Sequence, residues 1–336
     1  KGATNTVTKT VTATATARPL LIKHGWDMPY PDFVKANVTS MERLPFDGVV
    51  VSLPGTLGRL VQSQTPVSYD QFATALAPMA QTHFTTLTHN FVMVHSAPAG
   101  DVYGDWTVPL SNYANLARAA KDAGLTGIFR DNEEYYGAAM KYPDNCVNHT
   151  LVECQGQARL RGHQVMDAMR GTWPTVQVMT TNGPWISDPG TVYHLPGVTY
   201  YDGSTAYPLW GPFDIGMVEG AAGTSAKFID GGEIYTPRTQ AQFSTMKAWQ
   251  KQGMAANSSL IPSALKPQWA ATLSAGFGVY DQPWEGAGMD AATWKTTLAN
   301  AMATTDEYVW AYTERYDWWG TGYAGPAVPT DWVDAT

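Results

Sequence analysis

The sequence predicts an α/β protein folded as a single (β/α)8 TIM barrel, with long loops at the mouth formed by the C-terminal ends of its strands. From Pro19 onward, short apolar runs alternate with longer segments of helical period, as in repeated βα units. Eight such units fit within 336 residues, because these barrels commonly occupy about 250 residues or more. The main alternative, an open doubly wound sheet, usually has a glycine-rich phosphate loop after its first strand. The residues from His24 to Pro29 do not form one.

Residues 1–18 form a separate segment in which Thr alternates with Val and Ala. This period of two fits either an exposed Thr-rich linker or an extra strand with its Thr face outward, and we favour the linker. We therefore assign residues 19–336 to the barrel and expect no chemistry from the first segment.

Each predicted strand is a short apolar run between helical segments. The eight runs are Leu20–His24, Gly48–Leu53, Asn90–His95, Gly127–Asp131, Val176–Thr180, Lys227–Asp230, Gly276–Tyr280 and Tyr308–Tyr312. Ser111 is the expected N-cap of the helix before the fourth strand, and Gly124 stands where a left-handed C-terminal cap belongs. The apolar helix stripes are Leu116, Ala119, Ala120 and Ala123; Leu160, Val165, Met166 and Met169; Phe243, Met246 and Trp249; and Trp294, Leu298 and Met302.

Composition restricts the binding partner. The formal charge is -8 and no run of Lys or Arg occurs, which argues against nucleic acid and anionic lipid. No apolar stretch approaches the roughly 20 residues that span a membrane. Aromatic residues make up 12% of the chain, with 13 Trp and 17 Tyr, and their rings suit the apolar faces of sugars. We expect a carbohydrate partner and no cofactor, and the sequence leaves the oligomeric state open.

The two cysteines, Cys146 and Cys154, lie close together in a polar loop and predict one local disulfide. A zinc site is the less favoured alternative, because His149 and His163 do not complete the usual ligand spacing. Asn37, Asn148 and Asn257 each begin a glycosylation sequon. Together these features favour a secreted or periplasmic protein.

Acids follow the fourth strand in a pattern suited to catalysis. Phe129, Asp131 and Glu133 share one parity, so Glu133 should stand at the rim of the barrel with Asp131 just beneath it. Repulsion from the lower acid would raise the pKa of Glu133 and suit it to be a general acid. The structural alternative is that Asp131 pairs with Arg130 or another cation while Glu133 and Glu134 cap the next helix. Glu134 itself has the opposite parity.

Two further units could supply a second carboxylate. The sixth ends in Asp230 and Glu233 around a glycine pair that permits a sharp turn, and the alternative is an acid that starts a helix. The eighth places Glu314 in register with inward aromatics, and the alternative is an ion pair with Arg315. We expect Glu233 to be the second carboxylate, with Glu314 as its competitor and Asp131 in support.

Other side chains at the strand ends could bind substrate. The candidates are His24, Trp26, Asp27, Asn182, Trp185, Asp230, Tyr235, Asp281, Trp284, Trp310 and Tyr312, with Tyr201, Tyr207 and Trp210 in the long loop after the fifth strand. A metal-dependent hydrolase or lyase would instead use His24, His89 or His95 with aspartates. That class is disfavoured because no His-x-His or His-Glu-x-x-His pair occurs.

With these residues identified, the chain resembles the barrel glycoside hydrolases. Asn132-Glu133 is similar to the Asn-Glu pair of the large retaining clan that includes cellulases and β-galactosidases, in which that Glu is the acid/base. The chain departs from the clan at the seventh strand. There the clan has a nucleophilic Glu, whereas this strand ends at Asp281 with Glu285 further on.

Asp131-Asn132-Glu133 also resembles the end of the chitinase Asp-x-Glu motif, in which the Glu is the acid and the acetamido group of the substrate attacks. The longer acidic pattern of that motif is absent. The segment Asp230–Glu233 and the Trp-rich eighth unit are similar to bacterial barrel proteins suspected to be glycosidases.

These features predict a glycoside hydrolase that cleaves a poly- or oligosaccharide by a two-carboxylate acid/base mechanism, with Glu133 as general acid. The assignment to glycoside hydrolases rests partly on the analogy of the predicted barrel fold. The alternative is a non-catalytic carbohydrate-binding protein on a degenerate barrel, which would keep the aromatic mouth without working acids.

Overall fold

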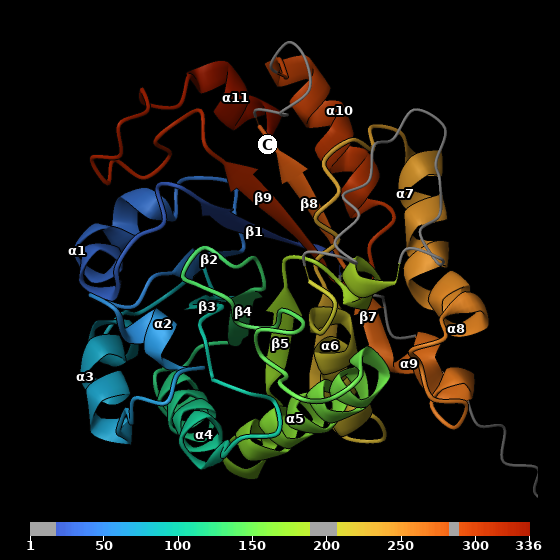
Figure 1. Ribbon diagram of the computed structural model, residues 1–336. Coiled ribbons are helices and arrows are strands. Elements are labelled where there is room, and N and C mark those ends of the chain that lie inside the picture. The colour runs from blue at the N-terminus through green and yellow to red at the C-terminus, as the bar shows by residue number, and fades with distance from the viewer. Residues whose placement is uncertain (1–17, 189–206, 282–288) are drawn as a thin grey trace, which may run out of the picture.

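The computed structural model describes residues 18–188, 207–281 and 289–336. Its strands are β1 (Leu20–Gly25), β2 (Gly48–Val51), β3 (Phe91–His95), β4 (Gly127–Asp131), β5 (Gln177–Thr180), β6 (Lys227–Asp230), β7 (Leu273–Ala275), β8 (Phe277–Tyr280) and β9 (Tyr308–Thr313). All pair in parallel, in the order β7-β6-β5-β4-β3-β2-β1-β9-β8 (Figure 1). The Thr-rich segment before Arg18, and Tyr201, Trp284 and Glu285, lie outside the described residues.

The sheet closes on itself. β7 and β8 stand at the two ends of the strand order, yet only Gly276 separates them in the chain. They are the two halves of one strand, of which β7 pairs with β6 and β8 with β9. The Gly276 N–H donates to the Asp230 carbonyl at 2.7 Å, which joins the halves. The predicted (β/α)8 barrel is therefore confirmed, with its seventh strand in two pieces, and the open-sheet alternative is wrong.

The barrel interior is filled by large side chains from most strands. They are Ile22, Val50, Phe91, Met93, Phe129, Met179, Ile229, Tyr308 and Trp310. A second and larger cluster fills the space between the strands and the surrounding helices. Because neighbours on a strand alternate between these two clusters, Phe129 and Ile229 fix which side chains of β4 and β6 face inward.

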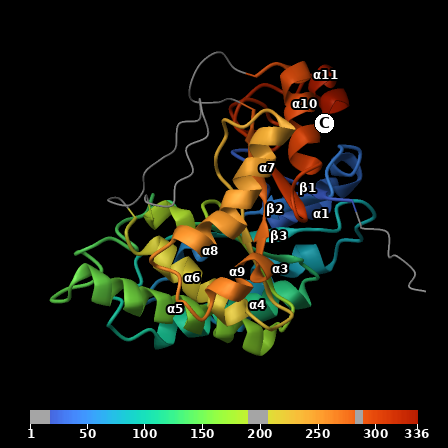
Figure 2. The ribbon, with the colours of Figure 1, turned by 90° about the vertical axis from the view of Figure 1, so that its right-hand side faces the viewer.

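The helices surround the strands (Figures 1 and 2). They are α1 (Pro31–Met41), α2 (Leu57–Leu60), α3 (Tyr69–Ala80), α4 (Thr107–Asp122), α5 (Leu151–Thr172), α6 (Trp210–Ala221), α7 (Gln240–Ala248), α8 (Met254–Asn257), α9 (Trp269–Thr272), α10 (Ala291–Met302) and α11 (Thr330–Ala335). No helix in the described ranges is long and apolar enough to cross a membrane.

The helix stripes were largely as expected. All the predicted stripe residues of α4, α7 and α10 are buried or packed on the core, as are those of α5 except Leu160, which is 47% exposed. α4 begins at Thr107, before the expected cap Ser111, because Pro109 is tolerated in the first turn of a helix. Gly124 has a positive φ of 75°, as predicted for the residue that ends α4.

The predicted disulfide between Cys146 and Cys154 is present. It joins the end of the long loop after β4 to the first turn of α5. Thr150 caps the same turn by accepting from the Glu153 N–H. The loop that carries Glu133 is thus anchored at its far end by a covalent bond and a capped helix.

Candidate active site

The candidate site lies at the C-terminal ends of β4 and β6, where the chain brings together acids that are far apart in sequence. Phe129 lies inside the barrel, and Asp131 and Glu133 follow it at steps of two. Glu233 follows β6 after a turn in which Gly232 has a φ of 57°, and its N–H donates to the Thr181 carbonyl at 3.1 Å. A Cβ at Gly232 would stand 2.6 Å from the Gly276 carbonyl oxygen, so this turn requires glycine.

Glu133 is largely buried at the mouth. Its N–H donates to Asp131 Oδ1 at 2.9 Å, and the Tyr135 hydroxyl donates to its Oε2. Burial and, after it, the negative charge of Asp131 raise the pKa of Glu133 to about 7, against the opposing effect of the Tyr135 hydrogen bond. Asp131 thus lies next to Glu133, and its charge adds to the effect of burial on the pKa of Glu133.

Glu233 is held from two sides. Asn182 Nδ2 donates to its Oε2 at 2.8 Å, and the Tyr235 hydroxyl donates to its Oε1 at 2.7 Å. Burial raises the pKa of Glu233 well above its usual range, and the charges of Glu133 and Asp131 raise it further. Those two charges lie close enough to act on Glu233, so the structure brings the acids of the fourth and sixth units together.

Asp131 does not pair with Arg130. The Arg130 guanidinium instead forms a fully buried ion pair with Asp214 on α6, so the expected alternative of an Asp131–Arg130 pair is wrong. Asp131 Oδ2 faces His95 Nδ1 at 3.8 Å, and its Oδ1 holds the Glu133 N–H. Asp131 therefore positions Glu133 and repels its charge.

The side chains of Asn132 and Glu134 form hydrogen bonds that stabilise the loop after β4, and they do not line the mouth. The Asn132 side chain is fully buried and bridges Thr181, the Asn182 backbone and Asp214, which ties the ends of β4 and β5 to α6. Glu134 accepts from the Met140 N–H at 2.7 Å and from Trp210 Nε1 at 3.0 Å. These contacts fix the backbone on both sides of Glu133.

Glu314 occupies another part of the mouth. The Tyr280 hydroxyl donates to its carboxylate, and its N–H donates to Asp281 Oδ1 at 3.0 Å. Arg315 turns away to the Met289 carbonyl, so among the residues described here no ion pair joins it to Glu314. The charges that act most on Glu233 are those of Glu133 and Asp131, which favours Glu233 over Glu314 as the partner of Glu133.

Aromatic rings line the mouth between these acids. Tyr235 stacks on Tyr312 with ring centroids 5.9 Å apart and planes 15° apart. Trp310 is fully buried beneath them, packs against His24 and donates from Nε1 to the Gly231 carbonyl at 2.7 Å. Trp26 is 57% exposed and donates to the Tyr312 hydroxyl at 2.6 Å. Trp310 thus forms the support, while Trp26 and Tyr312 lie nearer the opening.

His24 is a neutral member of this aromatic cluster. Its ring lies 4.7 Å from Phe129 and 5.4 Å from Tyr312. Burial lowers the pKa of His24 to about 3, with the Lys23 charge acting in the same direction. An imidazole that stays neutral at physiological pH keeps one ring nitrogen as an acceptor.

Several side chains that were predicted to contact substrate instead form hydrogen bonds or ion pairs within the protein. Asp230 faces the helix layer, where it accepts from the Gly232 N–H and from Trp185 Nε1, and Trp185 is itself buried. Asp27 is buried in an ion pair with Lys23, and Asp281 accepts backbone N–H groups. We therefore assign Asp27, Asp230, Asp281 and Trp185 to supporting the loops rather than to binding substrate.

Trp210 and His89 are also displaced from the expected lining. Trp210 opens α6 and is fully buried, rather than lying in a loop. His89 precedes β3, and its ring faces Tyr308 at the start of β9, so it lies at the opposite end of the barrel. No group of three or more His, Cys, Asp or Glu residues in the described part of the chain is placed to hold a metal ion.

Tyr135 and Lys23 are not among the site residues predicted from the sequence, whereas Tyr280 belongs to the seventh unit that was expected to contact substrate. Tyr135 lies two residues beyond Glu133, and the same parity could have identified it. Tyr280 ends β8, where its hydroxyl reaches Glu314. Lys23 is a charged residue in an otherwise apolar strand, which is itself a signal of a buried ion pair.

No model of a known protein family and no curated protein matches the sequence. Among solved structures, GH5_18 from Streptomyces cattleya in complex with GlcNAc is 13% identical over 96% of this chain and 80% of its own, with a TM-score of 0.50. An endocellulase from Pyrococcus horikoshii is 9% identical over 94% of this chain and 89% of its own, with a TM-score of 0.44. D-psicose 3-epimerase from Clostridium cellulolyticum is 10% identical over 94% and 95%, with a TM-score of 0.43. The likeness to GH5_18 supports the barrel fold.

Proposed function

We propose that this protein is a glycoside hydrolase that cleaves glycosidic bonds of a poly- or oligosaccharide, with Glu133 as general acid and Glu233 as the second carboxylate. The observation that carries the proposal is the convergence of Asp131, Glu133 and Glu233 at the C-terminal ends of β4 and β6, where the charges of Glu133 and Asp131 add to burial in raising the pKa of Glu233. Active sites of this fold are built at that end of the barrel.

The pair is suited to hold one proton at neutral pH. Burial raises the pKa values of both carboxyls, the charge of Asp131 adds to the rise at both, and the charge of Glu133 adds to it at Glu233. Glu233 receives one donor on each oxygen, whereas Glu133 receives a single side-chain donor. The two carboxyls titrate as a coupled pair, and the proposed mechanism requires that their shared proton stands on Glu133 and that Glu233 is ionised when the substrate binds. This gives one acid and one base in the same site.

The chemistry then follows the two-carboxylate scheme. Glu133 transfers its proton to the glycosidic oxygen as the bond from that oxygen to the anomeric carbon breaks. In a retaining reaction Glu233 attacks the anomeric carbon, and water activated by Glu133 later releases the sugar. In an inverting reaction Glu233 instead takes a proton from the attacking water. The anomeric form of the first product, followed by NMR, distinguishes the two.

The substrate is expected to be a carbohydrate because of the aromatic mouth. Trp26 is exposed, and its indole is fixed by the Tyr312 hydroxyl. Such rings offer flat apolar faces with a polar edge, as the faces and hydroxyls of a sugar require. The disulfide favours a secreted or periplasmic location, because disulfides persist in oxidising compartments.

The test is Glu133→Gln, which keeps the shape of the side chain and removes its proton. We expect turnover of the best substrate from a glycan panel to fall by about 10²–10⁴-fold. The Kd measured by calorimetry should stay within about threefold, because uniform binding is retained. Glu134→Gln, one residue away and outside the mouth, is the matched control. Unchanged turnover in Glu133→Gln would remove Glu133 from the mechanism.

One observation favours the alternative of a non-catalytic carbohydrate-binding protein. Glu133 Oε2 and both oxygens of Glu233 already accept hydrogen bonds from the protein itself. On that alternative the acids would only bind hydroxyl groups. It predicts saturable glycan binding with no product after prolonged incubation, and equal binding by the wild type and by Glu133→Gln.

A further inference from the structure

We propose that Lys23 is a positioning residue that fixes the loop after β9, residues 314–322, and through it places Glu314 at the mouth. The effect of Lys23 on substrate rests on the function proposed above, whereas its effect on the loop does not.

Lys23 is a charge buried completely inside the protein. It lies on β1 between Ile22 and His24, whose side chains face the barrel interior, so its own side chain points the other way. There it forms an ion pair with Asp27, and both side chains are fully buried. Its Nζ also donates to the His24 carbonyl at 3.2 Å and lies 5.8 Å from the Trp319 ring centroid. A buried ammonium is stable only with such partners.

Asp27 connects Lys23 to the loop. Its Oδ2 accepts from the Trp318 N–H at 2.8 Å, and its Oδ1 accepts from the Thr313 hydroxyl at 3.3 Å. One carboxylate therefore joins the first strand, the end of β9 and the loop that follows. Removing the Lys23 charge would leave this carboxylate buried without a cation.

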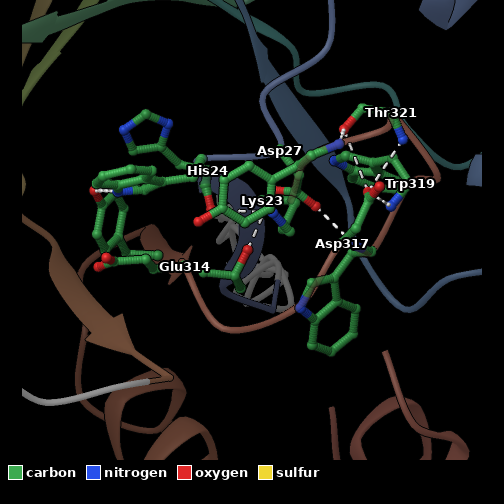
Figure 3. Close-up of polar contacts among 12 residues, drawn as sticks. Lys23, His24, Asp27, Glu314, Asp317, Trp319 and Thr321 are labelled. Atoms are coloured by element: carbon green, nitrogen blue, oxygen red, sulfur yellow. Dashed lines mark hydrogen bonds and ion pairs between the residues drawn. The ribbon is translucent and has the colours of Figure 1, made fainter. Parts of the chain in front are cut away.

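Two more aspartates share the Lys23 charge. Asp281 accepts from the N–H groups of Glu314, at 3.0 Å, and Arg315, at 3.2 Å. Asp317 folds the loop on itself by accepting from several consecutive backbone N–H groups, those of Trp319, Gly320, Thr321 and Gly322 (Figure 3). The charges of Asp27, Asp281 and Asp317 all act on Lys23.

Loss of the Lys23 charge would displace Glu314 from its place at the mouth. The Glu314 backbone is held by Asp281, and its carboxylate receives the Tyr280 hydroxyl. Without the Lys23 ammonium, the charges of Asp281 and Asp317, and that of Asp27 where it is kept, would lie uncompensated in a region of low dielectric. The loop would then move away from β1 and β8, and Glu314 would move with it.

The test uses the double variant Lys23→Met/Asp27→Asn, which removes both charges and keeps an amide oxygen for the Trp318 N–H. The matched control is Lys227→Met/Glu307→Gln, which removes an ion pair between β6 and the residue before β9. We expect amides of residues 314–322 to exchange with deuterium at least about tenfold faster only in the first variant. The single variant Lys23→Met should be less stable than the double, because it leaves Asp27 buried and unpaired.

Steady-state kinetics tests whether Lys23 positions Glu314 rather than only stabilising the fold. For the best glycan substrate, Lys23→Met/Asp27→Asn should raise KM by about tenfold and change kcat by less than about threefold. The KM increase should disappear when the same pair is changed in a Glu314→Gln background, because both changes remove the same contact.

The exchange and kinetic measurements can each contradict the proposed role of Lys23. Unchanged exchange in residues 314–322, or faster exchange with an unchanged KM, would overturn it. If the wild type turns over no glycan, the proposed hydrolase function fails instead. The deuterium measurement and glycan Kd values then take the place of KM, so the two failures remain distinguishable.

Discussion

At the scale of single residues, burial decides what each acid of the mouth can do. Glu133 and Asp281 both follow a strand of the barrel, yet Glu133 lies among other acids while Asp281 accepts backbone N–H groups. The pKa of Asp281 is raised to about 6 by burial, but its oxygens are committed to the loop. A raised pKa marks a catalytic acid only where the carboxyl also reaches the substrate.

The pH dependence of turnover should report the proton on Glu133. Its pKa is raised to about 7, so the protonated form needed by a general acid is lost as the pH rises through that value. Asp131→Asn keeps an acceptor for the Glu133 N–H and removes the charge that raises the pKa. We expect the descending limb of kcat to move to lower pH by about half a unit to one unit. The profile of kcat against pH for the best substrate measures this shift.

Glu314→Gln is the control for this prediction, since Asp131 is the charge that acts on Glu133. It should leave the descending limb where it is in the wild type. A limb that moves equally in both variants would show that Asp131 has no direct effect on Glu133.

The position of Glu133 above Asp131 could be predicted because strand parity alone determines it. The burial of Asp27 and Asp230 could not, because it depends on partners elsewhere in the chain, Lys23 and Trp185. Ile229 faces the barrel interior, which turns Asp230 outward, but that direction is known only once the strand register is known. Sequence reasoning thus found the acids and could not sort the supporting ones from the reactive ones.

At the scale of elements, the apolar runs predicted the strands to within two residues at their ends, apart from the seventh. There the first half, Leu273–Ala275, was missed because Ser274 and Gly276 interrupt the apolar run. α6 was read as a loop because it is buried almost throughout and has no polar face to give a helical period. β7 and α6 both depend on long-range packing, which the local sequence pattern does not reveal.

α6 is buried because glycines let it approach α5 closely. A Cβ on Gly162 of α5 would stand 1.8 Å from the Phe213 carbonyl oxygen, and one on Gly216 of α6 would stand 1.9 Å from that of Arg159. These contacts require the backbones themselves to meet. α6 also carries Asp214 and Trp210, which hold Arg130 and Glu134 on either side of Asp131 and Glu133.

We therefore predict opposite effects for two glycine substitutions in one helix. Gly162→Ala should lower the free energy of unfolding by about 2 kcal/mol or more, because the helices must separate. Gly156→Ala lies in α5 with nothing within 4 Å of the added Cβ, and should raise it by up to about 1 kcal/mol. Urea unfolding followed by circular dichroism gives both values. Equal effects at the two positions would contradict the close packing of α5 and α6.

At the scale of the whole molecule, barrel closure is what creates the site. β4 and β6 are separated only by β5, so Asp131, Glu133 and Glu233 meet at one mouth although about a hundred residues separate their ends in the chain. The like charges gathered there oppose folding when all are ionised. A working site of this kind reduces stability, and the reduction depends on pH.

The sign of that dependence follows from the raised pKa values. A carboxyl whose pKa is higher in the folded protein stabilises the fold below its ordinary pKa, and this contribution is lost as the pH rises through the folded value. His24 acts oppositely, because its pKa is lowered to about 3, but above its ordinary value of 6.5 it is neutral whether folded or unfolded. Glu133, whose pKa is about 7 in the folded protein, therefore loses a surplus proton between pH 6.5 and 8.

We predict that the free energy of unfolding falls by about 1–2 kcal/mol between pH 6.5 and 8, since one surplus proton changes it by about 1.4 kcal/mol per pH unit. Glu233→Gln removes one carboxylate and relieves Glu133 of its neighbour, so this variant should lose turnover yet unfold at a higher temperature than the wild type at pH 8. At pH 5 the difference should become smaller, because Glu133 is then protonated in both proteins and no longer repels Glu233 in the wild type. Glu307→Gln, at the opposite end of the barrel, should show no such pH-dependent gain. A Glu233→Gln variant less stable than the wild type at pH 8 would mean that the hydrogen bonds from Asn182 and Tyr235 outweigh the repulsion.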